Sequence, residues 1–201
     1  MTRPISVLGI GGSPREGSTT ERALRISIEA AEHRGAEVEL ITSSELDLPL
    51  YDPRTSLRAP RARRLVQLIA AADGIIVATP AYHGTVSGLM KNVLDYVEDL
   101  RDDGRPYFTG RAVGCLAVGQ GWQGAVSALA SLRTTTHALR GWPTPLGVAV
   151  NTETGVFRGE GQCGDPGVAG QLRTLGGQVV EFAEMSRAWE ASRLVGPATA
   201  V

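Results

Sequence analysis

The fold is decided by one stretch near the start of the chain, Ile5-Ser6-Val7-Leu8-Gly9-Ile10-Gly11-Gly12-Ser13-Pro14-Arg15-Glu16-Gly17-Ser18-Thr19-Thr20. Its first six residues are largely apolar and predict a buried strand, and a helical pattern begins at Thr20. Glycines and hydroxyl side chains lie between the two. A strand that passes through such a loop into a helix presents backbone N–H groups and the positive end of the helix dipole to an anion. The stretch therefore predicts a phosphate site at the end of the first strand.

Two common phosphate motifs are excluded by what this loop lacks. Gly12 and Gly17 have the spacing of a P-loop, but Ser18 stands where that motif requires lysine. Gly9-x-Gly11 leads to Pro14 where the dinucleotide fingerprint has its third glycine. The predicted phosphate is therefore neither that of ATP nor that of a Rossmann-bound NAD.

The rest of the chain alternates between apolar strand patterns and helical patterns. Further strands are expected at residues 37–41, 74–79, 112–118 and about 146–150. Helices are expected at residues 20–34, 61–72, 88–97, 124–140 and from Pro166 to about Glu190, although Gly176-Gly177 weakens the last pattern. Strict alternation of strands that are apolar on both faces with helices predicts an α/β fold. We expect a flavodoxin-like, doubly wound, five-stranded parallel sheet in the order 2-1-3-4-5, with helices on both faces.

The remaining segments read as loops or as an end. Loops are expected at residues 43–60, 101–110 and 151–164, and a flexible C-terminal tail at residues 191–201. Residues 1–190 are expected to form a single domain, because a chain of 201 residues buries about 70% of its unfolded surface as one unit.

Composition narrows the function classes. The net charge of −1 argues against a nucleic-acid-binding face and against the strongly acidic surface of a dedicated electron shuttle. No apolar run is long enough to span a bilayer, and the chain enters a core strand at once instead of a signal peptide, so we expect a cytoplasmic protein. Cys115 and Cys163 are expected to be free thiols, and no metal site is predicted.

Two later loops carry residues suited to a flat ring. Pro80-Ala81-Tyr82-His83-Gly84 follows the third predicted strand, and Gly119-Gln120-Gly121-Trp122 follows the fourth. We interpret Pro80 as fixing a rigid turn; taken alone, each loop is also compatible with an ordinary turn that carries an aromatic side chain. Ligands of doubly wound sheets bind beyond the carboxyl ends of the strands, at the switch between the first and third strands. The three loops are therefore predicted to converge on one crevice.

Two motifs at the right separation resemble a known family. They read Gly12-Ser13-x-Arg15-x-x-Ser18-x-Thr20 and Pro80-x-Tyr82-His83-Gly84-x-x-Ser87-Gly88-x-x-Lys91-Asn92-x-x-Asp95. The chain resembles the NADPH-dependent FMN reductase family over about residues 4–150, since that family pairs a GSxRxxSxN loop with a PxYxxSxxGxLKNxxD segment. It departs from the pattern at Thr20, where asparagine is usual, and at His83, where asparagine is common.

The resemblance implies a flavin-dependent oxidoreductase that uses FMN and NADPH or NADH. It implies that hydride would pass from the nicotinamide to flavin N5 and that electrons would then pass to free flavin or another small acceptor. The resemblance implies that the FMN phosphate is held by Ser13, Arg15, Ser18, Thr19 and Thr20. It implies that the ring is contacted by Pro80, Ala81, Tyr82, His83, Gly84, Gly119, Gln120, Gly121 and Trp122. No catalytic acid or base is assigned, because hydride transfer needs none, and His83 is the one candidate proton donor.

Arg15 favours a reductase over an electron carrier, because flavodoxins typically hold the phosphate with hydroxyl and N–H groups alone. Three alternatives stay open: a quinone, azo or nitro reductase with FMN as prosthetic group, a non-enzymatic electron-transfer protein, and a domain that has lost its ligand. The choice between NADPH and NADH is also open, since several arginines could meet a 2′-phosphate: Arg54, Arg58, Arg61 and Arg105.

The resemblance further implies a homodimer or homotetramer, with Lys91 at a position commonly used in subunit contacts. Residues 48–53 resemble a loop that reaches the neighbouring subunit's flavin, but they are equally compatible with a proline-stiffened surface turn. A flavin-dependent monooxygenase is a candidate partner by analogy. His33 and His137 are expected to be surface or packing residues.

Overall fold

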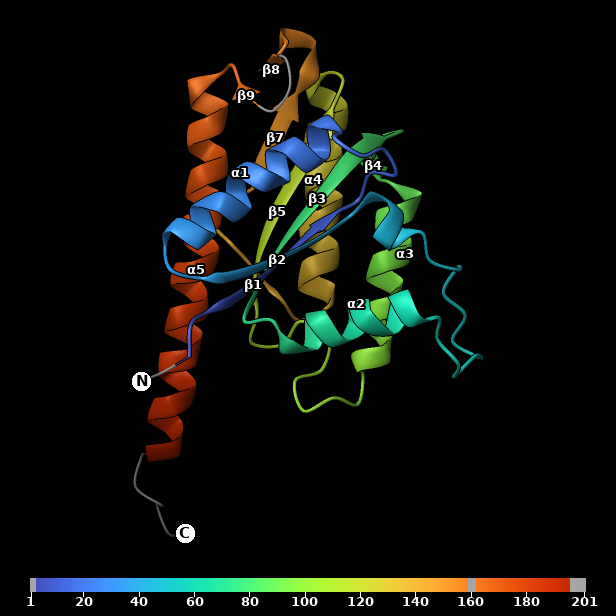
Figure 1. Cartoon of the computed structure of the whole chain (residues 1–201), viewed down its shortest axis with the longest axis vertical. Coiled ribbons are helices and arrows are strands. Elements are labelled where there is room, and N and C mark those ends of the chain that lie inside the picture. Colours follow the sequence, from blue (N-terminus) through green and yellow to red (C-terminus); the bar gives the residue numbers. More distant parts are fainter. Residues whose placement is uncertain (1–2, 159–161, 196–201) are drawn as a thin grey trace.

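A parallel sheet forms the centre of the molecule in the computed structural model, which describes residues 3–158 and 162–195 (Figure 1). Its long strands are β1 (Ser6–Gly11), β2 (Glu37–Thr42), β3 (Gly74–Tyr82) and β5 (Ala112–Gly119). They lie in the order β2-β1-β3-β5, and the fifth position beside β5 is shared by β6 (Trp142–Pro143) and β7 (Val148–Asn151). Counted along the main parallel strands this is the predicted order, and the fold class is confirmed.

The fifth strand is interrupted, which its sequence pattern did not predict. Partner numbers differ by 30 where Ala112 faces Trp142, but by 32 where Leu116 faces Val148. Two extra residues are therefore accommodated between β6 and β7. Pro145 lies in this gap and has no N–H to donate to a ladder, which is consistent with the break.

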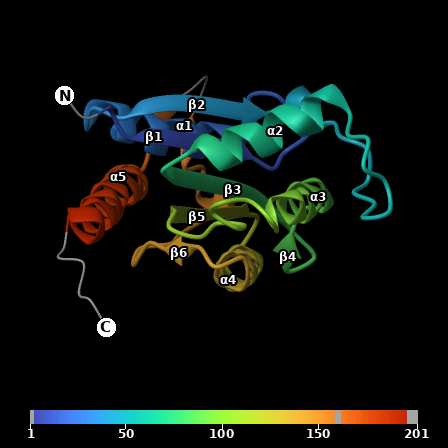
Figure 2. The ribbon, with the colours of Figure 1, turned by 90° about the horizontal axis from the view of Figure 1, so that it is seen from below.

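Helices cover both faces of the sheet (Figure 2). One face carries α1 (Thr19–His33) and α5 (Pro166–Val195), whose apolar side chains pack with the strands in one core cluster. The other face carries α2 (Pro60–Ala71), α3 (Gly88–Tyr96) and α4 (Trp122–Ala138), and Ile69, Met90 and Leu132 pack in a second cluster. Strands buried from both sides explain the nearly continuous apolar runs in the sequence.

Helix α5 differs from its prediction in two ways. It continues to Val195 and so includes the first five residues of the expected tail; residues 196–201 lie outside the described residues. Its Gly176-Gly177 pair does not interrupt it. A Cβ atom on Gly176 would lie 2.0 Å from the carbonyl oxygen of Ser27, so glycine is required here for α5 to cross α1 closely.

Several short elements lie in segments predicted to be loops. Turns of 3-10 helix span Ser43–Leu46 (η1), Val97–Leu100 (η2) and Thr152–Thr154 (η3). An antiparallel pair, β8 (Phe157–Arg158) and β9 (Gln162–Cys163), lies within the predicted 151–164 loop. The loop stacks on α1 through Phe157, whose ring lies 5.3 Å from the guanidinium carbon of Arg22.

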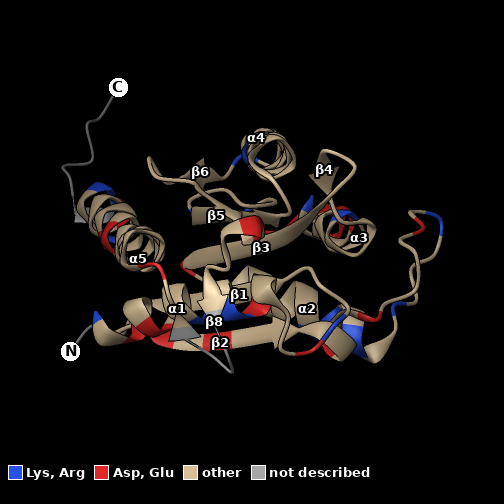
Figure 3. Cartoon of the chain, turned by 90° about the horizontal axis from the view of Figure 1, so that it is seen from above, with Lys and Arg blue, Asp and Glu red and all other residues tan. Residues whose placement is uncertain are grey.

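The distribution of charged residues and the state of the two cysteines agree with the expectations from composition. Basic and acidic segments are scattered over many elements in Figure 3 instead of gathering on one face. Both cysteines are free, and burial raises the pKa of Cys115 to about 11, so its thiol stays protonated at neutral pH. No helix in the described part of the chain is both long enough and apolar enough to cross a membrane.

Candidate functional site

The predicted phosphate loop lies between β1 and α1 and is fixed at both ends. The N–H of Gly12 donates to the carbonyl of Ala78 in β3 at 2.7 Å. A Cβ atom on Gly12 would lie 2.8 Å from the Cβ of Met90, so only glycine fits between the loop and α3. Ser18 caps α1, its hydroxyl accepting from the N–H of Glu21 at 3.2 Å. The loop therefore enters the helix with its backbone already ordered.

Glu21 is a functional neighbour that the sequence interpretation missed. Its carboxylate is buried, accepts from the N–H of Gly17 at 3.0 Å and pairs with Arg25 at 2.6 Å. The signal was present in the sequence, because Ser-x-x-Glu is a capping-box pattern at the start of a helix. Glu21 closes the loop on itself, while Arg25 offsets the negative charge that it places near the helix N-terminus.

Two side chains of this loop carry hydrogen-bond donors that have no partner among the described residues. The guanidinium of exposed Arg15 makes no hydrogen bond or ion pair with any described residue. The hydroxyl of Thr20 likewise has no partner among the described residues, although the residue is only 3% exposed. Ser13 is buried, and its hydroxyl accepts from the N–H of Arg15 at 3.3 Å, while Thr19 is the first residue of α1. These groups surround the N-terminus of a 15-residue helix, and together they fit a phosphate.

Ser87 joins this loop to the segment after β3. Its hydroxyl donates to the carbonyl of Gly12 at 2.7 Å and accepts from the N–H of Met90 at 3.0 Å, which caps α3. Its own N–H donates to the hydroxyl of Thr79 at 3.0 Å. All of these groups are buried, so the relative position of the two loops is fixed by satisfied hydrogen bonds.

The segment after β3 is a hairpin, and the predicted rigid turn at Pro80 is wrong. Pro80 is buried within β3, paired with Val118, and lies past Ala78, the last β3 residue that β1 pairs with. A proline is tolerated here because β1 no longer needs its N–H. Ala81 also belongs to the strand, and its partner is Val86 of β4 (Thr85–Val86).

The turn itself consists of His83 and Gly84, with φ angles of +53° and +81°. Two positive φ angles between paired Tyr82 and Thr85 are typical of a type I′ hairpin, for which Asn-Gly is the favoured sequence. His83 therefore occupies a left-handed position that asparagine adopts more easily. The hairpin holds the ring of Tyr82 half exposed.

The third loop lies against the second. A Cβ atom on Gly119 would lie 3.1 Å from the Cβ of Ala81, so the end of β5 approaches β3 closely. Gly121 has a φ of +90°, and Trp122 is the first residue of α4 with 57% of its surface exposed. Trp122 thus does not close the core. Gln120 is exposed beside it.

Asn151, at the end of β7, holds this third loop and was not singled out from the sequence. Its side-chain oxygen accepts from the N–H of Gly121 at 2.9 Å and from the N–H of Glu153 at 3.0 Å. Thr152 adds a bond from its hydroxyl to the carbonyl of Gly119 at 3.3 Å. No sequence signal links residues 30 positions apart, so this anchor could not have been found without the fold.

The loops after β1, β3 and β5 thus meet at one end of the sheet with the motif spacing noted above. Residues 5–155 match the model of the family described as NADPH-dependent FMN reductase. The chain belongs to this family. The resemblance inferred from the two motifs is confirmed.

Individual relatives agree with the family assignment. The chain is 32% identical over 132 residues to an NADPH azoreductase from Bacillus sp. (strain OY1-2), covering 65% of this chain and 68% of that protein. It is 33% identical over 135 residues to an NAD(P)H-dependent FMN reductase from Pseudomonas aeruginosa, covering 67% and 71%. The solved structure of FerB, an NAD(P)H:(acceptor) oxidoreductase from Paracoccus denitrificans, superposes with a TM-score of 0.74 at 23% identity, covering 90% and 98%. That likeness shows the shared fold.

Other residues considered from the sequence do not belong to the three loops of this FMN reductase family member. The candidate arginines all have partners within the chain: Arg54 with Asp52, Arg58 with Asp99, Arg61 with the Ser44 carbonyl, and Arg105 with the Ala70 and Ala72 carbonyls. His33 and His137 are exposed on helices, as expected. Lys91 pairs with Asp95 at 2.6 Å on α3.

The segment 48–53 is held firmly to α3. The amide of Asn92 accepts from the N–H of Tyr51 at 2.8 Å and donates to the carbonyl of Pro49 at 3.0 Å. Leu50 lies between these anchors and is 86% exposed. Leu50 is thus presented to solvent on a loop that is hydrogen-bonded to α3 on both sides of it.

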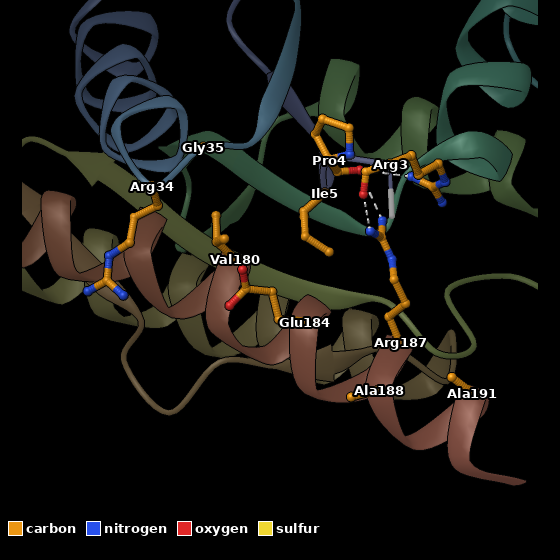
Figure 4. A pocket seen from close by; sticks show the side chains of 10 residues that line it. All are labelled: Arg3, Pro4, Ile5, Arg34, Gly35, Val180, Glu184, Arg187, Ala188 and Ala191. Carbon is orange, nitrogen blue, oxygen red and sulfur yellow. Dashed lines mark hydrogen bonds between the residues drawn. The ribbon is translucent and has the colours of Figure 1, made fainter. Parts of the chain in front are cut away.

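The opposite end of the sheet, where the strands begin, holds a cavity and ion pairs between side chains (Figure 4). A cavity of about 440 Å³ lies there between the start of β1 and α5, lined by Arg3, Ile5, Arg34, Val180, Glu184 and Arg187 among others. Arg187 donates to the carbonyls of Arg3 and Pro4, and both arginines pair with Asp73. Burial by itself would raise the pKa of Asp73, but hydrogen bonds from Arg3 and Ser6 and the charge of Arg187 hold it below its usual value.

The side chains that most often bind metal ions are not clustered in the described part of the chain. The described residues contain no group of three or more His, Cys, Asp or Glu side chains that could hold a metal ion.

Proposed function

We propose that this chain is an NAD(P)H-dependent flavin reductase whose FMN binds against the loops at the carboxyl ends of β1, β3 and β5. When bound, FMN would supply the redox chemistry, namely acceptance of a hydride from NADPH or NADH and onward electron transfer to free flavin or another small acceptor. Family membership supports the activity and both cofactors. The observation that carries the site is the ordered loop before α1, in which the Arg15 guanidinium and the Thr20 hydroxyl have no partners within the described chain.

The phosphate would be held by the residues of this loop. Arg15 contributes a charge-assisted hydrogen bond to a group that carries nearly two negative charges. The helix N-terminus adds N–H donors, and hydroxyls complete the shell, so that the phosphate residues are Ser13, Arg15, Ser18, Thr19 and Thr20.

The ring would lie between the two other loops. Tyr82 and Trp122 are large aromatic side chains with about half of their surface exposed, and they come from two neighbouring loops. Such side chains can flank a flat ring while the glycines allow close approach of the backbone. The proposed ring contacts are Pro80, Ala81, Tyr82, His83, Gly84, Gly119, Gln120, Gly121 and Trp122.

No side chain is assigned as catalytic acid or base. His83 lies at the exposed tip of the hairpin and remains the one candidate proton donor. The task of the protein is to position the reactants and to direct backbone N–H groups at the ring where negative charge develops.

A second candidate function keeps FMN as a prosthetic group and makes a quinone or azo compound the acceptor. It is favoured by the exposed Tyr82 and Trp122, whose rings can also stack on an aromatic acceptor. In either case we propose a cytoplasmic homodimer or homotetramer, in which Leu50 and its fixed loop lie in a subunit contact. A flavin-dependent monooxygenase supplied with reduced flavin is the proposed protein partner.

The test begins with the visible spectrum of the purified protein, followed by titration with NADPH and with NADH in the presence of FMN. Oxidation of either nicotinamide that depends on flavin supports the proposal. Yellow protein that keeps its flavin through gel filtration favours a prosthetic group with an aromatic acceptor, and colourless active protein favours flavin as substrate. FMN binding without turnover on any flavin or quinone would indicate an electron carrier, and no FMN binding by calorimetry would indicate a domain that has lost its ligand.

A further inference from the structure

Asn151 carries hydrogen-bonding capacity that no described residue of the protein uses. Only 4% of the residue is exposed. Its side-chain oxygen accepts from two backbone N–H groups, those of Gly121 and Glu153. Since N–H groups require an acceptor, these two bonds fix which end of the amide is oxygen. The amide nitrogen then occupies the other branch.

That nitrogen donates to no acceptor among the described residues, and it is not sealed inside the protein. Because this nitrogen reaches solvent, water can accept its hydrogen bonds in the free protein, and a ligand oxygen can take the place of that water. The two N–H groups of Asn151 are therefore open to a ligand with an acceptor oxygen.

The position of Asn151 in the sheet indicates which part of the ligand it meets. It pairs with Gly119 at the carboxyl end of β7, directly beside the Gly119–Trp122 loop. Along the order β1-β3-β5-β7 it lies three strand spacings, about 14 Å, from the end of β1 and its phosphate loop. This is too far for a bond to the phosphate, but it is within the length of an extended FMN molecule that runs across the strand ends.

We infer that Asn151 binds a carbonyl oxygen of the flavin ring with its side-chain N–H groups while its oxygen fixes the Gly119–Trp122 loop. This inference rests on the proposed FMN site and names one of its specificity-determining residues. A donor at a ring carbonyl favours the reduced ring, which carries more negative charge, so the residue also raises the reduction potential of the bound flavin.

Three variants separate the two roles of Asn151. Asn151→Asp keeps acceptor oxygens for Gly121 and Glu153 but loses the donors, whereas Asn151→Leu loses both. Thr152→Val is the matched control, because it removes the neighbouring bond to the carbonyl of Gly119 and leaves the Asn151 amide intact. Dissociation constants for FMN, thermal unfolding midpoints and the reduction potential of the bound flavin are measured for each protein.

We expect Asn151→Asp to keep an unfolding midpoint near that of the wild type, to bind FMN about tenfold more weakly or worse, and to shift the potential to more negative values. Asn151→Leu should also unfold at a lower temperature, and Thr152→Val should bind FMN like the wild type. The inference is overturned if Asn151→Asp binds FMN with wild-type affinity and potential, or if Thr152→Val weakens binding equally. Wild-type protein that binds no FMN would overturn the proposed function itself, and this inference with it.

Discussion

The two ends of the sheet differ in whether their polar side chains are already hydrogen-bonded within the described chain. At the amino end, Asp73 accepts four hydrogen bonds, two from Arg3, one from the N–H of Ser6 and one from Arg187. At the carboxyl end, donors on Arg15, Thr20 and Asn151 have no partner among the described residues. Polar groups that hydrogen-bond to one another stabilise the fold. Donors without a partner in the protein do not add to its stability, but they are available to bind a ligand. We therefore expect substitutions at the amino end to change stability and those at the carboxyl end to change binding.

The largest effect is expected from Asp73→Ala, which leaves two arginines and the N–H of Ser6 without their acceptor. Breaking a largely buried pair costs about 3–5 kcal/mol, and the exposure of Arg3 reduces this to about 2–3 kcal/mol. Denaturant unfolding measures the loss. FMN affinity should stay at the wild-type value, and a large change in affinity would break the proposed division between the two ends.

The same carboxylate predicts a pH dependence. Because the pKa of Asp73 is lower in the folded than in the unfolded protein, its stabilisation is complete above about pH 4, the unfolded value, and is lost as the pH falls through the folded value. The difference in unfolding free energy between wild type and Asp73→Asn should therefore be constant near neutral pH and shrink in acid. A difference that grew with acidity would contradict the assignment.

At the carboxyl end, Arg15→Ala should weaken FMN binding by about 1.5–3 kcal/mol, the usual range for a hydrogen bond to a charged group. Isothermal titration with FMN measures the change, and unfolding should be unaffected because the guanidinium has no partner in the described chain. Arg34→Ala is the matched control, an exposed arginine at the amino end. Equal FMN affinity in both variants would remove Arg15 from the phosphate site.

Gly121→Ala tests whether the backbone conformation of the third loop, at the carboxyl end of the sheet, matters for FMN binding. At a φ of +90° an alanine is strained by about 1–2 kcal/mol, and the loop that carries Trp122 must shift to relieve it. We expect weaker FMN binding, measured by flavin fluorescence. Gly124→Ala is the control, since its Cβ would meet Ala81 at an ordinary 3.8 Å and alanine favours the helix. Gly124→Ala with the larger defect would show that the conformation of Gly121 is not what matters.

The smallest effect is expected from His83→Asn. Asparagine tolerates the left-handed position in the hairpin, so stability should change by less than about 0.5 kcal/mol. The pH profile of turnover should also be unchanged, because hydride transfer needs no proton donor at this point. His83→Val provides the strained comparison, with a lower unfolding midpoint. A loss of turnover in His83→Asn at high substrate would instead assign a proton-transfer role.

Much of the fold followed from short-range patterns. Periodicity located the main strands and helices within a few residues, and the glycines and hydroxyls after the first strand indicated a phosphate. The errors share one physical cause. The role of Pro80 depended on where β1 ends, the Gly176-Gly177 pair on the crossing of α1, and the broken fifth strand on its register with β5. None of these is encoded within a local window.

By itself, the sequence determined the alternation of elements, the family and the three loops, because these depend on the chemistry of neighbouring residues. Only the tertiary structure decided which polar groups are already satisfied. It pairs Asp73 with Arg187 across 114 positions and Gly121 with Asn151 across 30. A hydrogen-bond donor is available to a ligand only if the fold brings no acceptor to it, and that property belongs to the packed chain as a whole.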